Sequence, residues 1–172
     1  TNRTQNVFHR DGTLVIKAIK EAYSGYNYTS GRLKTYNHYD FTFGKVEMRG
    51  KLPQATQGIW PAFWLLGSSI SLIAWPTCGE IDIMEFVGKD PTHTYGTFHG
   101  PGYSGGSGDG SSVVLNNPGD FHVWSVIWER DIVTWYLDGV QYHQLTAAEL
   151  AARGLGYVGN HDFFIIINMA VG

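Results

Sequence analysis

Short segments in which polar and apolar residues alternate recur along the chain, and this pattern limits the fold more than any other feature. The clearest segment is residues 45–52, Lys-Val-Glu-Met-Arg-Gly-Lys-Leu. Alternation of period two places successive side chains on opposite faces of a β-strand. We predict further strands at residues 12–20, 30–36, 58–66, 80–87, 92–99, 122–129, 132–137, 140–144 and 163–171.

The connections between these segments are typical of an all-β protein. Asp138-Gly139 separates two of the predicted strands and predicts a tight hairpin turn. The one helix signal is the capping box that begins at Thr146, with Glu149 three residues later and Gly154 at the end of a two-turn segment. Because no strand–helix–strand rhythm is present, we predict an antiparallel β-sandwich or jelly roll formed by a single domain, residues 1–172.

Composition excludes several classes of protein. Hydrophobic residues make up 43% of the chain and charged residues only 16%, which excludes a disordered polyelectrolyte. The net charge of −3 argues against a nucleic-acid partner, since phosphate binding needs a basic surface. The longest apolar run, residues 163–171, is interrupted by Asn168 and is shorter than the roughly 18 residues of a membrane span. Cys78 is the single cysteine, so no intramolecular disulfide can form, and we predict a packed residue.

A glycine-rich stretch follows the predicted strand that ends at His99. It contains Gly-x-Gly-x-x-Gly at Gly100, Gly102 and Gly105. A dinucleotide-binding loop of this pattern opens a helix, whereas here more glycines, serines and a tyrosine follow. We therefore predict a flexible loop beside a binding cleft over residues 100–112.

Three acids fall within six residues of one predicted strand. Glu80 and Asp82 share a face, whereas strict alternation would place Met84 on that face and Glu85 in the core. A buried, unpaired carboxylate costs several kcal/mol. One extra residue at about Ile83–Met84, a β-bulge, returns Glu85 to the acidic face. The sequence therefore predicts three carboxyl groups on one face of a bulged strand.

The expected spacing indicates a reaction type. Glu80 and Glu85 are about four strand steps apart, roughly 13 Å between Cα atoms, and their side chains can lean to leave roughly 5 Å between carboxyl groups. Retaining glycosidases have carboxyl groups about 5–5.5 Å apart, and inverting ones about 6.5–9.5 Å. Because three close carboxyls resist full ionisation, we expect a coupled titration with at least one proton retained near neutral pH.

Two other interpretations of this strand are a solvated acidic face and a Ca²⁺ site. A solvated face would carry Lys or Arg partners and would need no bulge. Calcium ligands come mostly from loops and include backbone carbonyls. Neither description fits the residues around Glu80, and a catalytic site fits better.

The strand and its surroundings resemble glycoside hydrolase family 16, in particular its bacterial endo-β-1,3-glucanases (laminarinases). The acids read as Glu-x-Asp-x-x-Glu, and flanking segments agree in order: residues 28–33 (YTSGRL), 44–49 (GKVEMR), 58–66 (GIWPAFWLL), 75–76 (WP) and 168–172 (NMAVG). The likeness extends from about residue 7 to residue 172.

The resemblance implies a concanavalin-like jelly roll with a substrate cleft along its concave sheet. It assigns the nucleophile to Glu80, the assisting acid to Asp82 and the acid/base to Glu85. The bulge residue favours cleavage of β-1,3 linkages in laminarin-type glucans; β-1,3-1,4-glucanase and galactan-cleaving specificities remain alternatives. A non-catalytic glucan-binding lectin is the alternative from another class, although such a protein would be expected to lose the acids.

The same resemblance sets expectations for ligands and context. Catalysis requires no cofactor and no metal, and a structural Ca²⁺ is implied only by the family. The expected partner is a polysaccharide, with no nucleic acid and no membrane, and we expect a monomer. A polymeric substrate favours an extracellular or periplasmic location. Family domains usually have strands before residue 7 and after residue 172, so we expect either truncation at both ends or sheet edges formed differently.

Further residues are candidates for substrate binding. Trp60 and Trp64 are four residues apart and share a strand face, and aromatic rings stack on the apolar faces of sugars. Trp75 precedes the acids, and His99 ends a strand where it can contact a sugar hydroxyl. Arg32, Asn27 and Asn168 match family positions near the cleft, and Asn168 needs a polar partner, for which we expect a sugar or a catalytic carboxyl. For Trp124 and Trp128 we predict core positions.

Overall fold

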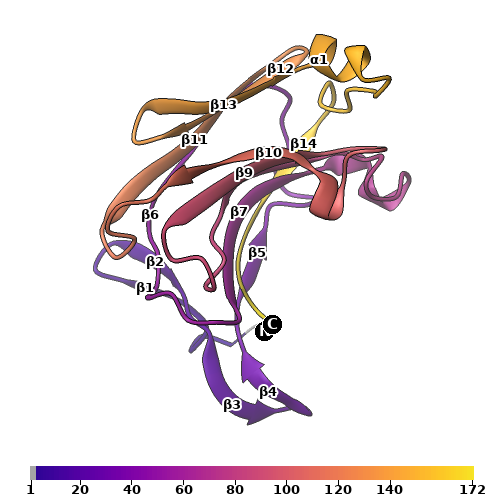
Figure 1. Cartoon of the computed structure of the whole chain (residues 1–172). Coiled ribbons are helices and arrows are strands. Elements are labelled where there is room, and N and C mark those ends of the chain that lie inside the picture. Colours follow the sequence, from indigo (N-terminus) through magenta and orange to yellow (C-terminus); the bar gives the residue numbers. More distant parts are fainter. Residues whose placement is uncertain (1–2) are drawn as a thin grey trace.

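The structure is a computed structural model, and it describes residues 3–172. Two antiparallel sheets pack against each other (Figure 1). The first sheet has six strands in the order β10 (Asp109–Val114), β9 (His93–His99), β8 (Glu80–Glu85), β7 (Ile59–Gly67), β14 (Phe163–Val171), β5 (Arg32–Lys34). The second has four, in the order β13 (Val140–Thr146), β12 (Ile132–Leu137), β11 (Phe121–Glu129), β6 (Gly44–Lys51). The predicted β-sandwich is confirmed.

Smaller elements decorate the two sheets. Two hairpins pair β1 (Val7–Arg10) with β2 (Thr13–Ile16), and β3 (Ile19–Tyr23) with β4 (Tyr26–Thr29). The β3–β4 hairpin extends away from the sandwich at the bottom of Figure 1. Two short 3₁₀ turns, η1 (Ser68–Ser71) and η2 (Gly105–Ser107), lie in loops. Within residues 3–172 the one α-helix is α1 (Ala147–Ala152), and no helix there is long and apolar enough to cross a membrane.

Large side chains fill the space between the sheets. Trp124 and Trp128, predicted to be core residues, are fully buried, and so is Trp135. Truncation of a buried tryptophan to alanine costs about 3–5 kcal/mol. Cys78 is also buried and has a free thiol, as predicted.

The local signals for turns and helix are confirmed. Asp138 and Gly139 have positive φ angles of 49° and 80°, as a two-residue turn with both central residues left-handed requires. Thr146 caps α1: its hydroxyl accepts from the Glu149 amide, and the Glu149 carboxylate accepts from the Thr146 amide.

The N-terminal strand predictions were too coarse. The segment 12–20 divides into β2 and the start of β3, and only Arg32–Lys34 of the segment 30–36 forms a strand. Strands β1 and β4 were not predicted. Residues 12–20 are mostly apolar and contain no glycine or proline after Gly12, so the sequence gave no signal of the break between the two hairpins.

The glycine-rich stretch is only partly a loop, which corrects the prediction. Residues 109–114 form β10 and pair with β9 along its whole length. A Cβ at Gly110 would lie 2.5 Å from the Gly96 carbonyl oxygen, so the glycine permits a close backbone approach within the sheet. The composition suggested a loop because it lacks the bulky residues typical of strands.

Candidate active site

The predicted bulge lies in β8. On one side Phe63 pairs with Met84 and Trp64 with Asp82, so Ile83 has no partner on β7. On the β9 side the register also shifts between Asp82 and Glu85. Ile81, Ile83 and Met84 point into the core, and Glu80, Asp82 and Glu85 line one cleft on the outer face of the six-stranded sheet. Three carboxyl groups on one face of a bulged strand are thus confirmed.

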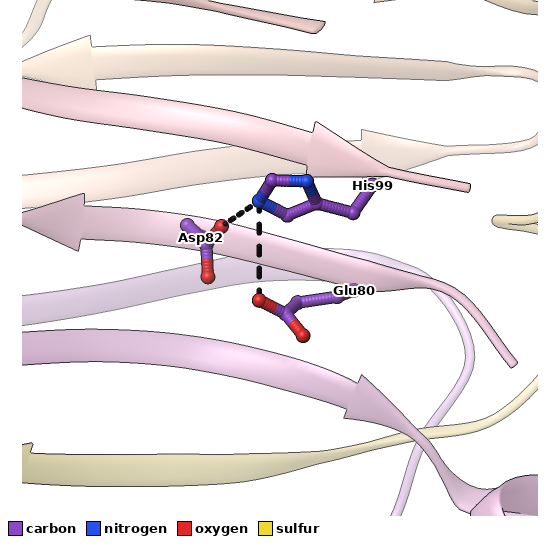
Figure 2. A group of neighbouring side chains, drawn as sticks. All are labelled: Glu80, Asp82 and His99. Carbon is purple, nitrogen blue, oxygen red and sulfur yellow. Dashed lines mark ion pairs between the residues drawn. The ribbon is translucent and has the colours of Figure 1, made fainter. Parts of the chain in front are cut away.

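Glu80, Asp82 and His99 form a close cluster (Figure 2). The two strands bring them together because Glu80 pairs with His99 across β8 and β9. Nε2 of His99 lies 2.9 Å from Oδ2 of Asp82 and 3.9 Å from Oε1 of Glu80. Sequence reasoning assigned His99 to a sugar hydroxyl and missed this contact with the acids. The sequence did contain a signal for this contact. If the predicted strands 80–87 and 92–99 pair as an antiparallel hairpin, the first residue of one lies opposite the last residue of the other, which places Glu80 beside His99.

The acids hold protons more tightly than ordinary carboxyls. Burial, reinforced by the charge of Asp82, raises the pKa of Glu80 to about 8. Burial first, and then the charge of Glu85, raise the pKa of Asp82 well above its usual range. Burial also raises the pKa of Glu85, against a hydrogen bond from Trp60 that lowers it. The pKa of each acid is raised, that of Glu80 to about 8, so the set is expected to retain at least one proton near neutral pH, as its crowding predicted.

Trp60 contacts one of the three acids, Glu85, and also lines the cleft. Its indole Nε1 donates a hydrogen bond to Oε1 of Glu85 at 2.9 Å, and its side chain is half-exposed. The ring therefore fixes the direction of the Glu85 carboxyl while leaving apolar surface open to a ligand.

Trp64, Asn168 and Arg32 form a second group on the cleft floor. Nε1 of Trp64 donates to Oδ1 of Asn168 at 2.8 Å, so the partner of Asn168 is an indole, not the catalytic carboxyl we expected as one of two possibilities. The Arg32 guanidinium lies 4.8 Å from the centre of the Trp64 ring. Since that face is covered, Trp64 cannot stack a sugar there unless Arg32 moves.

The cleft continues on both sides of the acids. On one side a pocket of about 740 Å³ is lined by Asn27 and Arg32, and by Asn168 of β14. On the other a pocket of about 490 Å³ is lined by Trp75 and His99. Both pockets include Trp60, Glu80 and Glu85. All ten sequence-predicted site residues therefore line this continuous cleft: Glu80, Asp82, Glu85, Trp60, Trp64, Trp75, His99, Arg32, Asn27 and Asn168.

Other residues of the cleft were not predicted. Tyr26 and Tyr28 on β4 line the larger pocket, and both are exposed. Tyr95 and Thr97 on β9 line the smaller one. The alternation Tyr26-Asn27-Tyr28 could have marked β4 as a strand, but the turn glycine before it concealed the pattern.

The glycine-rich loop closes the cleft beside His99. Gly105, Gly106 and Gly108 line the smaller pocket, as the predicted loop beside a cleft requires. A Cβ at Gly108 would lie 2.4 Å from Cε1 of His99. The imidazole therefore packs directly against loop backbone, which leaves it little freedom to turn away from Asp82.

Side chains of the types that bind metal ions also gather in the cleft. Within the described part of the chain, one group of three metal-ligating side chains lies close together, Glu80, Asp82 and His99. Calcium takes oxygen ligands, six to eight in number, and an imidazole nitrogen is not one of them. The ligand chemistry of this cluster therefore does not fit Ca²⁺.

Comparison with known proteins agrees with the geometry. Residues 1–161 match the family described as "Glycosyl hydrolases family 16". The chain is 34% identical over 192 residues to "Glucan endo-1,3-beta-glucosidase A1" of Niallia circulans, covering 100% of this chain and 27% of that protein. It is 35% identical to "Beta-glucanase" of Rhodothermus marinus, covering 99% of this chain and 62% of that protein.

A solved structure is more similar still. The catalytic domain of an endo-1,3-beta-glucanase (laminarinase) from Thermotoga petrophila superimposes with a TM-score of 0.93 at 48% identity. The match covers 98% of this chain and 70% of that one. The chain thus spans about a quarter to two-thirds of the length of the two curated relatives above. With its family match, its fold and its bulged acidic strand, the chain belongs to glycoside hydrolase family 16.

Proposed function

We propose that this chain is the catalytic part of an endo-acting, retaining β-glucanase that cleaves β-1,3 linkages in laminarin-type glucans. The observation that carries the proposal is the position of Glu80, Asp82 and Glu85 on one face of a bulged strand, in the middle of a cleft that continues on both sides. The names of two of the similar proteins, a glucan endo-1,3-beta-glucosidase and an endo-1,3-beta-glucanase (laminarinase), support the linkage.

The arrangement supports a double displacement. Glu85, whose pKa burial raises, is the general acid and gives its proton to the glycosidic oxygen while the Glu80 carboxylate attacks the anomeric carbon. The C–O bond to the leaving sugar breaks and a glycosyl ester of Glu80 forms. Glu85, now ionised, takes a proton from water, which attacks the same carbon and releases Glu80. No cofactor enters this sequence.

Neighbouring side chains have defined tasks in this scheme. Trp60 donates to Glu85 and so orients the acid. Asp82, the most buried of the three acids, hydrogen-bonds with Glu80. With Asp82 holding a proton, Glu80 can ionise without a second negative charge beside it.

An endo mode follows from the shape of the cleft. Because Trp60, Glu80 and Glu85 belong to the pockets on both sides, sugar units can occupy the cleft before and after the bond that is cut. Tyr26 and Tyr28 on one side, and Trp75 on the other, offer exposed aromatic surface for those units.

The test is hydrolysis of a panel of laminarin, lichenan, agarose and carrageenan, with proton NMR of the first products. We expect new reducing ends from laminarin above all, and the β-anomer first, with the α-anomer appearing only by mutarotation. Faster cleavage of lichenan or agarose would reassign the substrate. An α-anomer formed first would show inversion and contradict the assignment of Glu80 as nucleophile.

Binding without cleavage is the competing function. If laminarin binds tightly and no reducing ends appear, the chain is a glucan-binding module and the catalytic proposal fails. The retention of all three acids, each with its hydrogen-bonding neighbours in place, favours the enzyme.

The proposed substrate also bears on location and assembly. A glucan polymer does not enter a cell, so we propose that the enzyme acts outside the cytoplasm, and as a monomer, since the cleft is formed by one chain. Fractionation of the source cells and light scattering of the purified chain test these two points.

A further inference from the structure

Two buried side chains donate hydrogen bonds to the backbone on either side of the bulge. Nε1 of Trp135 donates to the carbonyl oxygen of Asp82 at 2.8 Å. Oγ1 of Thr94 donates to the carbonyl oxygen of Glu85 at 3.0 Å. Trp135 and Thr94 are both fully buried. The two carbonyls belong to the residues between which the register with β9 shifts.

Trp135 reaches the bulge from the opposite sheet. It lies on β12, at the centre of the four-stranded sheet, whereas Asp82 lies on β8 of the six-stranded sheet. A Cβ at Gly96 would lie 2.4 Å from Cδ1 and 2.8 Å from Nε1 of Trp135. Gly96 stands on β9 between Tyr95 and Thr97, which pair with Glu85 and Asp82. The missing side chain at this position gives the indole room to approach the bulge.

These contacts matter because a bulge locally disrupts the hydrogen-bond ladder of its strand. A slip of one residue would move Glu85 to the core face and separate the acids. Hydrogen bonds to the Asp82 and Glu85 carbonyls oppose that slip, since either carbonyl would lose a buried donor.

We propose that Trp135 and Thr94 are positioning residues that hold the two ends of the bulge and so keep Asp82 and Glu85 in register on the cleft face. The inference rests on the proposed function for its kinetic readout. Neither residue lines the cleft or touches a substrate in it; both act through the β8 backbone.

The first test compares Trp135→Phe with Trp128→Phe. Both tryptophans are fully buried, and each donates one hydrogen bond to a backbone carbonyl, that of Trp128 going to Gly159 at 2.9 Å. The two variants lose the same chemical group from the same core. We expect similar losses of thermal stability but a fall in kcat of about 10- to 100-fold in Trp135→Phe alone, with KM changed much less.

The second test uses the other end of the bulge and a smaller change. Thr94→Val keeps the shape and removes the hydroxyl, and Thr134→Val does the same at a buried threonine whose hydroxyl accepts from Gln144. We expect Thr94→Val to lower kcat and to shift the pH profile of kcat, because the spacing of the coupled carboxyls changes. Thr134→Val should leave both unchanged. Should Trp135→Phe fail to fold, the threonine pair decides the question.

The outcomes are separable from the proposed function. Equal kcat and equal pH profiles in Trp135→Phe and Trp128→Phe, or in Thr94→Val and Thr134→Val, would overturn the positioning role. If the wild type cleaves no glucan, the proposed function fails. The positioning role can then be tested without activity, by following the titration of the three carboxyl groups with ¹³C NMR. In that case the acids must titrate differently in Trp135→Phe than in Trp128→Phe, and identical titrations reject the inference.

Discussion

Strands β6 and β8 have similar sequence patterns, but the acid of β6 is exposed to solvent and those of β8 are largely buried. In both, charged residues alternate with apolar ones, and the apolar set faces the core. On β6 the acid Glu47 pairs with Lys45 at 2.5 Å, and both side chains are about half exposed. On β8 the Asp82 side chain is 4% exposed, and its Oδ2 lies 2.9 Å from Nε2 of His99 instead of beside a Lys or Arg.

The difference lies in the neighbours, not in the alternation. Within residues 3–172, no Lys or Arg forms an ion pair with Glu80 or Asp82. Removing carboxyls from water without a permanent cation raises their pKa values, and this is a property of reactive acids more than of solvated ones. A functional site can therefore be distinguished from a solvated strand face by two features. Its acids have no Lys or Arg partner, and the alternation of its strand needs a bulge.

The largest effect should come from replacing either of the two glutamates on β8 with glutamine. Glu80→Gln removes the proposed nucleophile and Glu85→Gln the proposed acid, so we expect kcat to fall by several orders of magnitude, on the order of the 10⁴–10⁶ typical of essential catalytic groups. Glu47→Gln on β6 is the matched control and should retain full activity. Rates on laminarin, with circular dichroism to verify folding, measure this. Near-normal rates in either β8 variant would remove the distinction between the two strands.

A smaller effect is expected in the pH dependence of stability. Glu80 and Asp82 bind protons more tightly in the folded than in the unfolded chain, so the free energy of unfolding should fall as pH rises from about 4 toward 8. Asp82→Asn removes one of these groups. We expect it to reduce that fall by on the order of 1 kcal/mol or more, about 2–4 °C in Tm.

Thermal melts at pH 5 and pH 8 measure this difference, with Glu47→Gln as control. The control should have the same pH dependence as the wild type, because Glu47 lies on the solvated face of β6. If Asp82→Asn also shows the wild-type slope, then Asp82 does not retain its proton in the folded chain.

The smallest effect should come from breaking the β6 ion pair. Lys45→Met leaves Glu47 exposed to water, and exposed pairs of this kind contribute about 0–1 kcal/mol. We expect a change below about 0.5 kcal/mol in the free energy of unfolding and no change in kcat. Denaturation in urea measures the former. A larger loss would mean that β6 is not a simple solvated face, and the contrast with β8 would need another explanation.

The local part of the site could be predicted from the sequence. Alternation required a bulge near Ile83, and the bulge brought Glu85 beside Asp82, as the register of β8 confirms. Residues of the flanking strands were found in the same way, because Trp60 and Trp64 share a face by their spacing alone.

Contacts between the two sheets, and between strands far apart in the sequence, could not be predicted. The hydrogen bond from Trp135 to Asp82 joins residues 53 positions apart in different sheets, and no local pattern encodes such a pairing. The same holds for Asn168 and Trp64, whose contact depends on β14 lying beside β7. Strand β10 was missed because its one glycine, Gly110, is required by the close approach of Gly96 on the neighbouring strand, which the local sequence does not show.

Five of the six tryptophans fall into two groups that differ in their access to solvent. Trp124, Trp128 and Trp135 lie dry between the sheets, whereas Trp60 and Trp75 are 48% and 44% exposed in the cleft. An aqueous quencher reaches the second group and not the first, and an oligosaccharide lying over Trp60 and Trp75 shields them from it. Fluorescence quenching therefore reports occupancy of the cleft in the unlabelled protein, even in a variant that no longer cuts its substrate.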